Sequence, residues 1–274
     1  MVGLPMTSVV LARGLGRRMR EADAGVSLDT EQQVAAAAGQ KGMMPVGRDG
    51  RPFLDHVLSS LADAGAGDVV LVVAPDHAII RAHYAASRLS RVSVRCAVQP
   101  DATGTAHAVL AAEPLVGDRP FLVLNADNLY PVDVLRSLVD LDGPGLPAFE
   151  RARLVEESGF PEDRVAQFAV LDVDAHGWLA GIEEKPDVRD LEASGPRALI
   201  SMNVWRFDGR IFDACRDVPR SARGEYELPE AVGLALTRGV RFRVLPARGA
   251  VLDLSRRADI ARVAARLGEQ EPHL

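Results

Sequence analysis

Short apolar runs alternate with helical patterns over the first half of the chain. The runs are apolar almost throughout, which is typical of strands buried on both faces of a parallel sheet. They cover residues 8–12, 68–74, 92–98 and 121–124. Between them, apolar residues recur with the spacing of one helix face. These segments cover residues 52–64, a stretch ending near residue 87, 104–112 and 131–141. The alternation predicts a mostly parallel sheet with helices packed on its faces.

The pattern changes after about residue 145. Residues 165–173 and 178–183 flank a turn-rich connection, which predicts a β-hairpin. Later segments predict a strand, a helix, a strand and a closing amphipathic helix, over residues 199–207, 227–237, 240–245 and 256–267. No flexible linker separates the halves. We therefore expect one domain, residues 1–274, with a nucleotide-type half over about 1–125 and a second-substrate half over about 126–254.

One segment interrupts the alternation, between Arg20 and Lys41. It contains Thr30-Glu31-Gln32-Gln33, which has the spacing of a helix capping box, and then Val34 and four alanines. A short helix inside the first loop is therefore predicted. Loops of this length in compact domains are usually lids or disordered segments.

Composition narrows the class of protein. The net charge of −6 argues against a nucleic-acid-binding surface, and no apolar run is long enough to span a membrane. Cys96 and Cys215 match no disulfide framework or zinc site, and we expect both thiols to be buried and free. The start of the chain lacks a secretory signal pattern. These features predict a cytoplasmic protein, and a homo-oligomer is compatible with them.

The basic residues are unevenly divided. Of 32, only Lys41 and Lys185 are lysines. Arginine bias across the chain marks these two as candidates for positions that require a compact ammonium group.

Glycines follow the first predicted strand, in Gly14-Leu15-Gly16-Arg17-Arg18-Met19. Glycines at a strand end let backbone N–H groups approach a phosphate. Met19 replaces the third glycine of a dinucleotide fingerprint, and the lysine and hydroxyl residue of a Walker loop are missing. The arginines suit a polyphosphate. The alternative is an ordinary strand-to-helix turn with solvated arginines.

Further motifs follow in a fixed order. After Gly14-x-Gly16-x-Arg18-Met19 come Gln40-Lys41-Gly42-Met43-Met44-Pro45-Val46, Gln99 with Gly104-Thr105-Ala106-His107, Asn125-Ala126-Asp127, Glu184-Lys185-Pro186, Gly224-Glu225-Tyr226-Glu227-Leu228 and Val251-Leu252-Asp253. In this order, over nearly the whole chain, they resemble the motifs of the sugar-1-phosphate nucleotidylyltransferases. The opening pattern of that family is G-x-G-x-R-[LM], followed by P-K-P-x-x-P-V.

This resemblance implies a three-layer α/β/α Rossmann-like fold, similar to GT-A folds, with a mixed, mostly parallel central sheet. It implies that an NTP and a sugar-1-phosphate react to give an NDP-sugar and pyrophosphate, with Mg²⁺ as cofactor. The acceptor phosphate attacks the α-phosphorus in line. Because both reactants are anions, catalysis should depend mainly on positioning and charge neutralisation.

The resemblance also implies the site residues. Catalysis falls to Arg18, Lys41 and Lys185. Nucleotide binding falls to Leu11, Ala12, Gly14, Gly16, Gln99, Gly104 and Thr105. Acceptor binding falls to Asn125, Glu184, Lys185 and Asn203, and metal binding to Asp127 and Asp253.

Several of these residues have a simpler alternative. Asp127 is placed to cap the helix that begins near Pro131, and Asp253 could cap the last helix. Glu184 could be a strand-end charge without further role. His107 is expected to pack or form a hydrogen bond rather than to catalyse.

Departures from the family pattern leave the substrate open. Gln40 and Gly42 replace prolines, Arg13 replaces a small residue beside the base, and the 20–41 insert is long. The segment at Gln99 is most similar to that of uridylyl-transferring members, so UTP or dTTP is expected. The chain end leaves no room for an acetyltransferase domain, so a bifunctional enzyme is not expected. The alternatives are a non-catalytic nucleotide-sugar-binding module and transfer to a cyclitol or choline phosphate.

Overall fold

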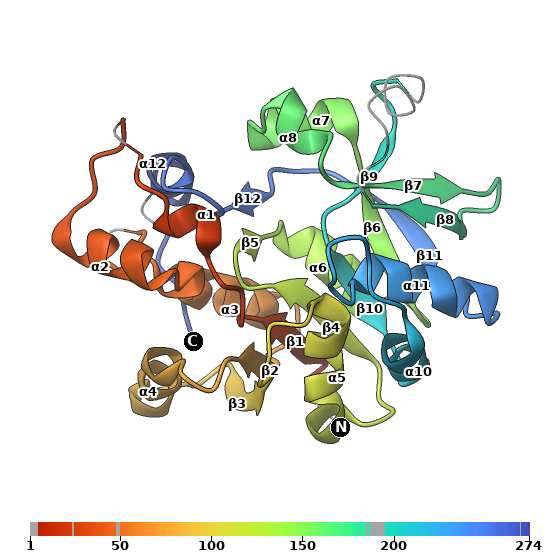
Figure 1. Cartoon of the computed structure of the whole chain (residues 1–274), viewed down its shortest axis with the longest axis horizontal. Helices are drawn as coiled ribbons and strands as arrows, with labels where there is room; N and C mark the ends of the chain where they lie inside the picture. Colours follow the sequence, from red (N-terminus) through yellow and green to blue (C-terminus); the bar gives the residue numbers. More distant parts are fainter. Residues whose placement is uncertain (1–4, 24, 48–49, 185, 187–194, 269) are drawn as a thin grey trace.

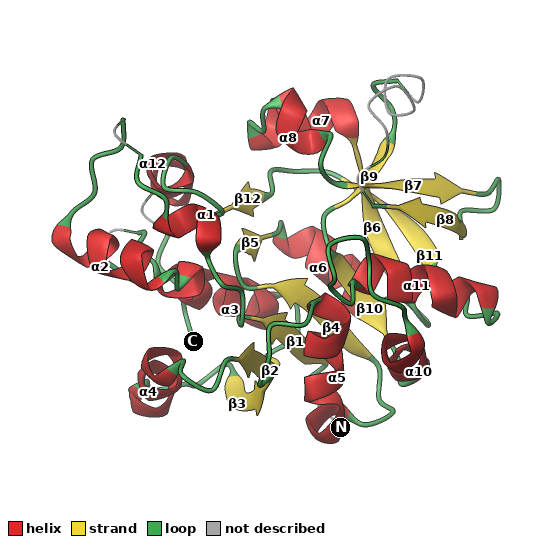
Figure 2. Ribbon diagram, in the orientation of Figure 1, coloured by secondary structure: helices red, strands yellow, loops and turns green. Residues whose placement is uncertain are grey.

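The structure is a computed structural model that describes residues 5–23, 25–47, 50–184, 186, 195–268 and 270–274. Its centre is a mixed, ten-stranded sheet with the order β3-β2-β1-β4-β10-β6-β9-β7-β8 and with β11 beside β6. Helices cover both faces of this sheet (Figures 1 and 2). The expected three-layer α/β/α arrangement is therefore confirmed.

The first half of the sheet is parallel. It consists of β1 (Thr7–Leu11), β2 (Asp68–Val73), β3 (Ser93–Val98) and β4 (Phe121–Asn125). Successive side chains divide between two cores, since Val10, Leu122 and Leu124 join one and Val9, Phe121 and Val123 join the other. Burial on both faces explains why β1, β2 and β4 are largely apolar, whereas β3 lies at the edge of the sheet, is mostly half-buried and contains Arg95.

Helices on each face complete the two cores. One face carries α3 (Phe53–Asp63), α4 (Ala78–Ala86), α6 (Val132–Val139) and α12 (Asp259–Leu267). The other face carries α5 (Thr105–Val116), α10 (Arg210–Asp217) and α11 (Leu228–Thr237). All but α10 were expected from the helical spacing of apolar residues.

The second half of the sheet differs in detail from the expected elements. The segment 199–207 forms two strands, β9 (Leu199–Ser201) and β10 (Val204–Phe207), because the chain turns at Asn203, whose φ is +57°. The hairpin strand β7 (Ala169–Val173) starts late because α8 (Glu162–Val165) precedes it, and it pairs with β8 (Leu179–Glu183). β11 (Arg243–Ala247) also begins later than expected.

Two elements near the centre were not expected from the sequence. They are β6 (Gly145–Glu150) and the helix after it, α7 (Arg151–Ser158). β6 contains both glycine and proline, which are unfavourable signals for a strand. It nevertheless pairs with β10, β9 and β11.

The 20–41 insert contains the expected helix, α2 (Thr30–Ala38), after the short α1 (Arg17–Arg20). The capping box lies one residue earlier than expected. Asp29 accepts a hydrogen bond from the Gln32 backbone, and the Gln32 side chain accepts one from the Asp29 backbone. The helices α1 and α2 lie side by side (Figure 1), and residues of α1 and of the segment after α2 line the cleft described below.

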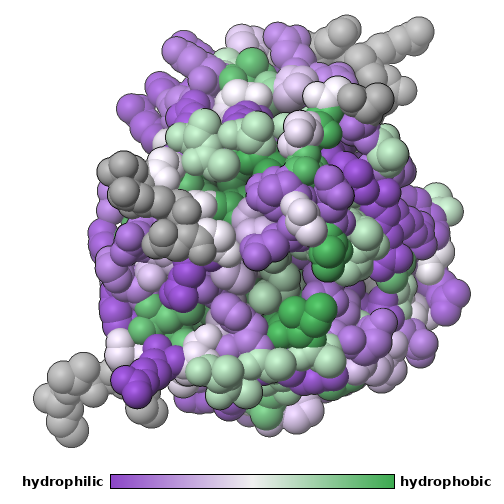
Figure 3. Space-filling model, turned by 90° about the vertical axis from the view of Figure 1, so that its left-hand side faces the viewer, coloured by the Kyte–Doolittle hydropathy of each residue, from purple (hydrophilic) through white to green (hydrophobic). Residues whose placement is uncertain are grey.

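The two cysteines differ in burial. Cys215 is a buried free thiol, as expected, but Cys96 is only half-buried. In the described part of the chain, no helix is both long and apolar enough to cross a membrane. On the face shown in Figure 3, hydrophobic residues are interspersed among hydrophilic ones.

Gly104 joins two distant segments at one tight contact. Its φ is +123°, and a Cβ added there would lie 2.3 Å from the Tyr226 carbonyl oxygen. The Tyr226 backbone also bonds to Thr103 and Ala106 on either side. Glycine is therefore required by both the backbone conformation and the space available.

We expect Gly104→Ala to lower the free energy of unfolding by about 3 kcal/mol or more, since strain adds to displacement of backbone. Gly239→Ala is the matched control. Its φ is +85°, but nothing lies within 4 Å of an added Cβ. That variant should lose only about 1 kcal/mol. Chemical denaturation measures both, and equal losses would contradict the steric argument.

Candidate functional site

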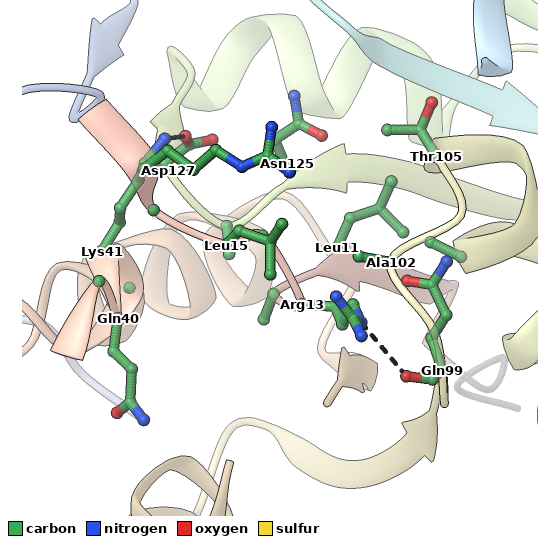
Figure 4. A pocket seen from close by; sticks show the side chains of 18 of the residues that line it. Leu11, Arg13, Leu15, Gln40, Lys41, Gln99, Ala102, Thr105, Asn125 and Asp127 are labelled. Carbon is green, nitrogen blue, oxygen red and sulfur yellow. Dashed lines mark hydrogen bonds and ion pairs between the residues drawn. The ribbon is translucent and has the colours of Figure 1, made fainter. Parts of the chain in front are cut away.

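A cleft of about 390 Å³ lies where the parallel strands end. Open α/β sheets place ligands at the carboxyl ends of their strands. The cleft brings together most of the candidate residues: Leu11, Ala12, Gly14, Gly16, Arg18, Lys41, Gln99, Gly104, Thr105, Asn125 and Asp127. Figure 4 shows side chains from the first loop, the insert and the ends of β3 and β4 around this space.

The glycine loop is held in place by the insert. Gly16 has a φ of +60°, and a Cβ added there would lie 2.1 Å from the Gly39 carbonyl oxygen. Arg20 strengthens this contact by donating to the Ala38 carbonyl oxygen at 2.9 Å. The end of α2 therefore fixes both the glycine loop and the segment that leads to Lys41.

Lys41 begins a short 3₁₀ helix, Lys41–Met43, and faces Asp127. Its Nζ lies 2.8 Å from Asp127 Oδ2 (Figure 4). Burial alone would lower the pKa of Lys41, but the Asp127 carboxylate outweighs that effect, and the pKa is raised above its ordinary value. Lys41 is therefore a cation in the cleft at neutral pH.

Asp253 is brought beside Asp127 by a small two-stranded sheet. β12 (Leu252–Asp253) pairs with β5 (Asn128–Leu129), and Leu254 N donates to Asp127 O at 2.9 Å. Burial raises the pKa of Asp253, and the nearby charge of Asp127 raises it further. Two segments about 125 residues apart in the sequence thus place two carboxylates close together.

Each of these carboxylates is paired with one cation. Lys41 contacts one oxygen of Asp127, and Arg164 from α8 lies 2.5 Å from Asp253 Oδ1. Arg164 is held in turn by Asp259 at 2.8 Å. Sequence reasoning missed Arg164, because nothing in its local sequence signals a contact with a residue 89 positions away.

Neither aspartate is a helix cap, so that alternative is wrong for both. The N-cap of α6 is Pro131 and that of α12 is Ala258. Asp259 instead accepts hydrogen bonds from the Ser255 and Arg256 backbone N–H groups. Among the described residues, no group of three or more His, Cys, Asp and Glu side chains forms a complete metal cage.

The donor set still fits a hard divalent cation. Mg²⁺ is commonly held by one or two carboxylates together with substrate phosphates. Lys41 contacts Asp127 Oδ2 and Arg164 contacts Asp253 Oδ1. The other oxygens, Asp127 Oδ1 and Asp253 Oδ2, form no ion pair with these two cations. A cation there would also offset the repulsion between the two carboxylates.

A second cleft of about 200 Å³ adjoins the first. The two share Leu11, Thr105, Asn125 and Glu225 in their walls. The second contains the candidates Glu184 and Asn203, together with Arg223 and Glu227. Lys185, which was predicted to bind the acceptor, lies outside the residues that the structure describes.

Arg223 is the one basic side chain among the described residues that line the second cleft. It is about half exposed, pairs with Glu227 and lies 3.7 Å from Glu184. Sequence reasoning missed it, although it directly precedes the Gly224-Glu225 motif. Its position makes it available to an anion that enters this cleft.

The other end of the first cleft is largely apolar. Leu11, Ala102 and Gln99 lie at this end (Figure 4), and Ile80 and Ala108 are further apolar residues of the cleft lining. The Gln99 amide nitrogen donates to the Gly104 carbonyl oxygen at 3.0 Å, which leaves the amide oxygen as an acceptor. Arg13 also lies at this end, but its guanidinium group donates to the Gln99 and Pro100 carbonyl oxygens, so this end suits an uncharged planar group.

Nearby residues connect the two halves of the site. Thr105 Oγ1 accepts a hydrogen bond from Leu228 N at 2.9 Å. His107 stacks on Tyr226 with 3.8 Å between ring centroids, and its Nδ1 lies 2.9 Å from Thr103 Oγ1. The packing and hydrogen-bonding role expected for His107 is confirmed.

Comparisons with known proteins agree with this arrangement. A family model described as nucleotidyl transferase matches residues 36–254. The UTP–glucose-1-phosphate uridylyltransferase AglF of Haloferax volcanii is 31% identical over 97% of this chain and 98% of its own. A glucose-1-phosphate thymidylyltransferase of Mycolicibacterium smegmatis is 26% identical over 89% of this chain and 75% of its own.

Solved structures share the fold. A UDP-glucose pyrophosphorylase complexed with UDP-glucose superimposes with a TM-score of 0.77, at 15% identity, over 97% of this chain and all of the other. The ordered motifs, the two adjoining clefts and these matches lead to one assignment. The chain belongs to the nucleotidyl transferase family, among the sugar-1-phosphate nucleotidylyltransferases.

Proposed function

We propose that this enzyme uses UTP or dTTP and a sugar-1-phosphate, with Mg²⁺, to form an NDP-sugar and pyrophosphate. The observation that carries the proposal is the pair of adjoining clefts. One combines a glycine loop with Arg18 and Lys41, and the other combines carboxylates and amides with one arginine. The first suits a nucleoside triphosphate, and the second suits a polyhydroxylated phosphate.

The chain's own residues supply positioning and charge. Backbone N–H groups at Gly14 and Gly16 hold the triphosphate, and Arg18 stabilises the pyrophosphate as it leaves. Lys41 neutralises charge at the α-phosphate. No general base is needed, because the acceptor phosphate is already an anion at neutral pH, and its oxygen displaces pyrophosphate directly.

Asp127 and Asp253 would hold the Mg²⁺ ion. When bound, it would supply further positive charge to offset the charge of the phosphates. Arg164 keeps Asp253 in place through the contact of 2.5 Å.

Acceptor binding falls to the second cleft. Glu184, Asn125 and Asn203 offer acceptors and donors for sugar hydroxyls. Arg223 supplies positive charge for the sugar phosphate, and the resemblance of the Glu184-Lys185-Pro186 motif assigns the same role to Lys185. The acceptor phosphate then lies beside the wall that the two clefts share.

The Gln99 amide supports the choice of base. Its oxygen is an acceptor, since its nitrogen is engaged by Gly104. The ring N3–H of uracil and thymine is a donor, whereas N3 of cytosine is an acceptor. A uracil or thymine ring therefore complements Gln99, which favours UTP and dTTP.

A panel of NTPs and sugar-1-phosphates, assayed for pyrophosphate release, tests the function directly. We expect turnover with UTP or dTTP, and a loss of about 10²-fold or more in Lys41→Ala, the scale for removing one transition-state electrostatic contact. Lys41→Arg keeps the charge but not the compact shape, and should recover only part of the rate. Tight nucleotide binding without turnover across the panel would instead indicate a non-catalytic module.

Metal binding is checked separately from turnover. We expect Asp253→Asn to weaken Mn²⁺ binding, measured by electron paramagnetic resonance, by about 10-fold or more. Asp259→Asn is the control, because it also removes an ion pair with Arg164 but changes no proposed ligand. Unchanged Mn²⁺ affinity in Asp253→Asn would refute the ligand assignment.

Asn203 allows the acceptor cleft to be tested without loss of stability. Its φ of +57° is a conformation that glycine adopts readily. Asn203→Gly should raise the KM for sugar phosphate by about 2- to 12-fold, the equivalent of one lost hydrogen bond, without lowering the free energy of unfolding. Asn203→Ala should raise KM similarly and also destabilise the fold. A KM unchanged in both variants would remove Asn203 from the acceptor site.

A further inference from the structure

Arg13 lines the first cleft, at the end of the central sheet. It lies two residues after the end of β1, and its Nε and Nη2 donate to the carbonyl oxygens of Gln99 and Pro100 at 3.3 and 3.0 Å. Those residues follow β3, and β2 lies between β1 and β3. Across the end of β2, the side chain therefore links the segment after β1 to the segment after β3, and Figure 4 shows its contact with Gln99.

In this arrangement the Arg13 guanidinium group bridges two backbone carbonyls and is not a freely moving charge. Its two bonded N–H groups face backbone carbonyls, and its Nη1 is buried without a hydrogen-bond partner in the described part of the chain. Swinging the side chain aside would unpair both carbonyl bonds. A group held in this way is a fixed wall of the cleft.

The Arg13 side chain lies at the apolar end of the cleft (Figure 4). Arg13 is bonded to Gln99, which lies at the same end of the cleft as Leu11 and Ala102 (Figure 4). Lys41 and Asp127 lie at the other end (Figure 4). Under the proposed function, phosphates occupy the cationic end, so the nucleobase meets Arg13.

We propose that Arg13 determines nucleobase size: by bracing the Gln99 edge and closing the apolar end of the cleft, it admits one pyrimidine ring and excludes the second ring of a purine. This inference rests on the proposed function, since it requires a nucleotide in the cleft. Arg13 acts by position and bulk, and it takes no part in the transfer of the nucleotidyl group.

The chain contains a matched control. Arg81 also donates to two consecutive carbonyl oxygens, those of Ala74 and Pro75 at 3.1 and 2.8 Å. These residues follow β2, next to the carbonyls that Arg13 holds. Arg81 does not line the cleft. Removing it deletes the same kind of bridge between two carbonyls without opening the base end.

The test compares kcat and KM for UTP, dTTP, ATP and GTP with glucose 1-phosphate as the common acceptor. We expect the pyrimidine-to-purine ratio of kcat/KM to fall about 10-fold or more in Arg13→Ala, mainly because the KM for purines falls. Arg81→Ala should change the ratio by less than about 3-fold. Should Arg13→Ala not fold, Arg13→Gln, which is shorter and uncharged, makes the same comparison.

The outcomes separate this inference from the proposed function. An unchanged ratio in a folded Arg13 variant overturns the role of Arg13 and leaves the proposed function intact. A wild-type enzyme that already prefers purines overturns the role of Arg13 and the choice of UTP or dTTP, but not nucleotidyl transfer itself. Wild-type protein that binds and turns over no nucleotide refutes the proposed function, and the inference with it.

Discussion

The site depends on two carboxylates held close together in a place where charge is costly. Asp127 and Asp253 repel each other, and burial adds to the cost at Asp253, as its raised pKa shows. Their separation is set by backbone pairing between β5 and β12, so the chain cannot relieve the repulsion by moving one side chain away. Instead, Lys41 and Arg164 each pair with one of the two carboxylates. This arrangement keeps the site assembled, and each cation contacts only one oxygen of its carboxylate.

The two cations have different positions and therefore different consequences. Arg164 is anchored on its other side by Asp259, so it is part of the scaffold. Lys41 lines the cleft, and its ammonium group is carried on a flexible stem. A phosphate that enters the cleft can therefore compete with Asp127 for Lys41 while Arg164 continues to hold Asp253. Without substrate, Lys41 and Arg164 thus balance the charges of Asp127 and Asp253, and an incoming phosphate can replace Asp127 as the partner of Lys41.

Much of the fold was predictable because burial on both faces leaves a strong pattern in the sequence. β1, β2 and β4 are apolar almost throughout for this reason. β6 was not predictable, since its glycine and proline mask a central strand whose pairing comes entirely from distant partners. The site divides in the same way. Short motifs indicated Lys41, Gln99 and Asp127, whereas the contacts of Arg164 depend on tertiary structure that no local pattern records.

The scarcity of lysine also has a structural side. Many arginines in this chain donate to backbone carbonyls at the ends of elements, as Arg13, Arg81 and Arg206 do. A guanidinium group presents several donors in a fixed plane and can hold two carbonyls at once, which a single ammonium group does less well. Arginine is therefore not merely a substitute for lysine at these positions. Lys41 is the contrasting case: it meets a single carboxylate oxygen, and the same small group can follow charge as it develops on a phosphate. The division of roles between the two residue types thus follows the geometry of what each must bind.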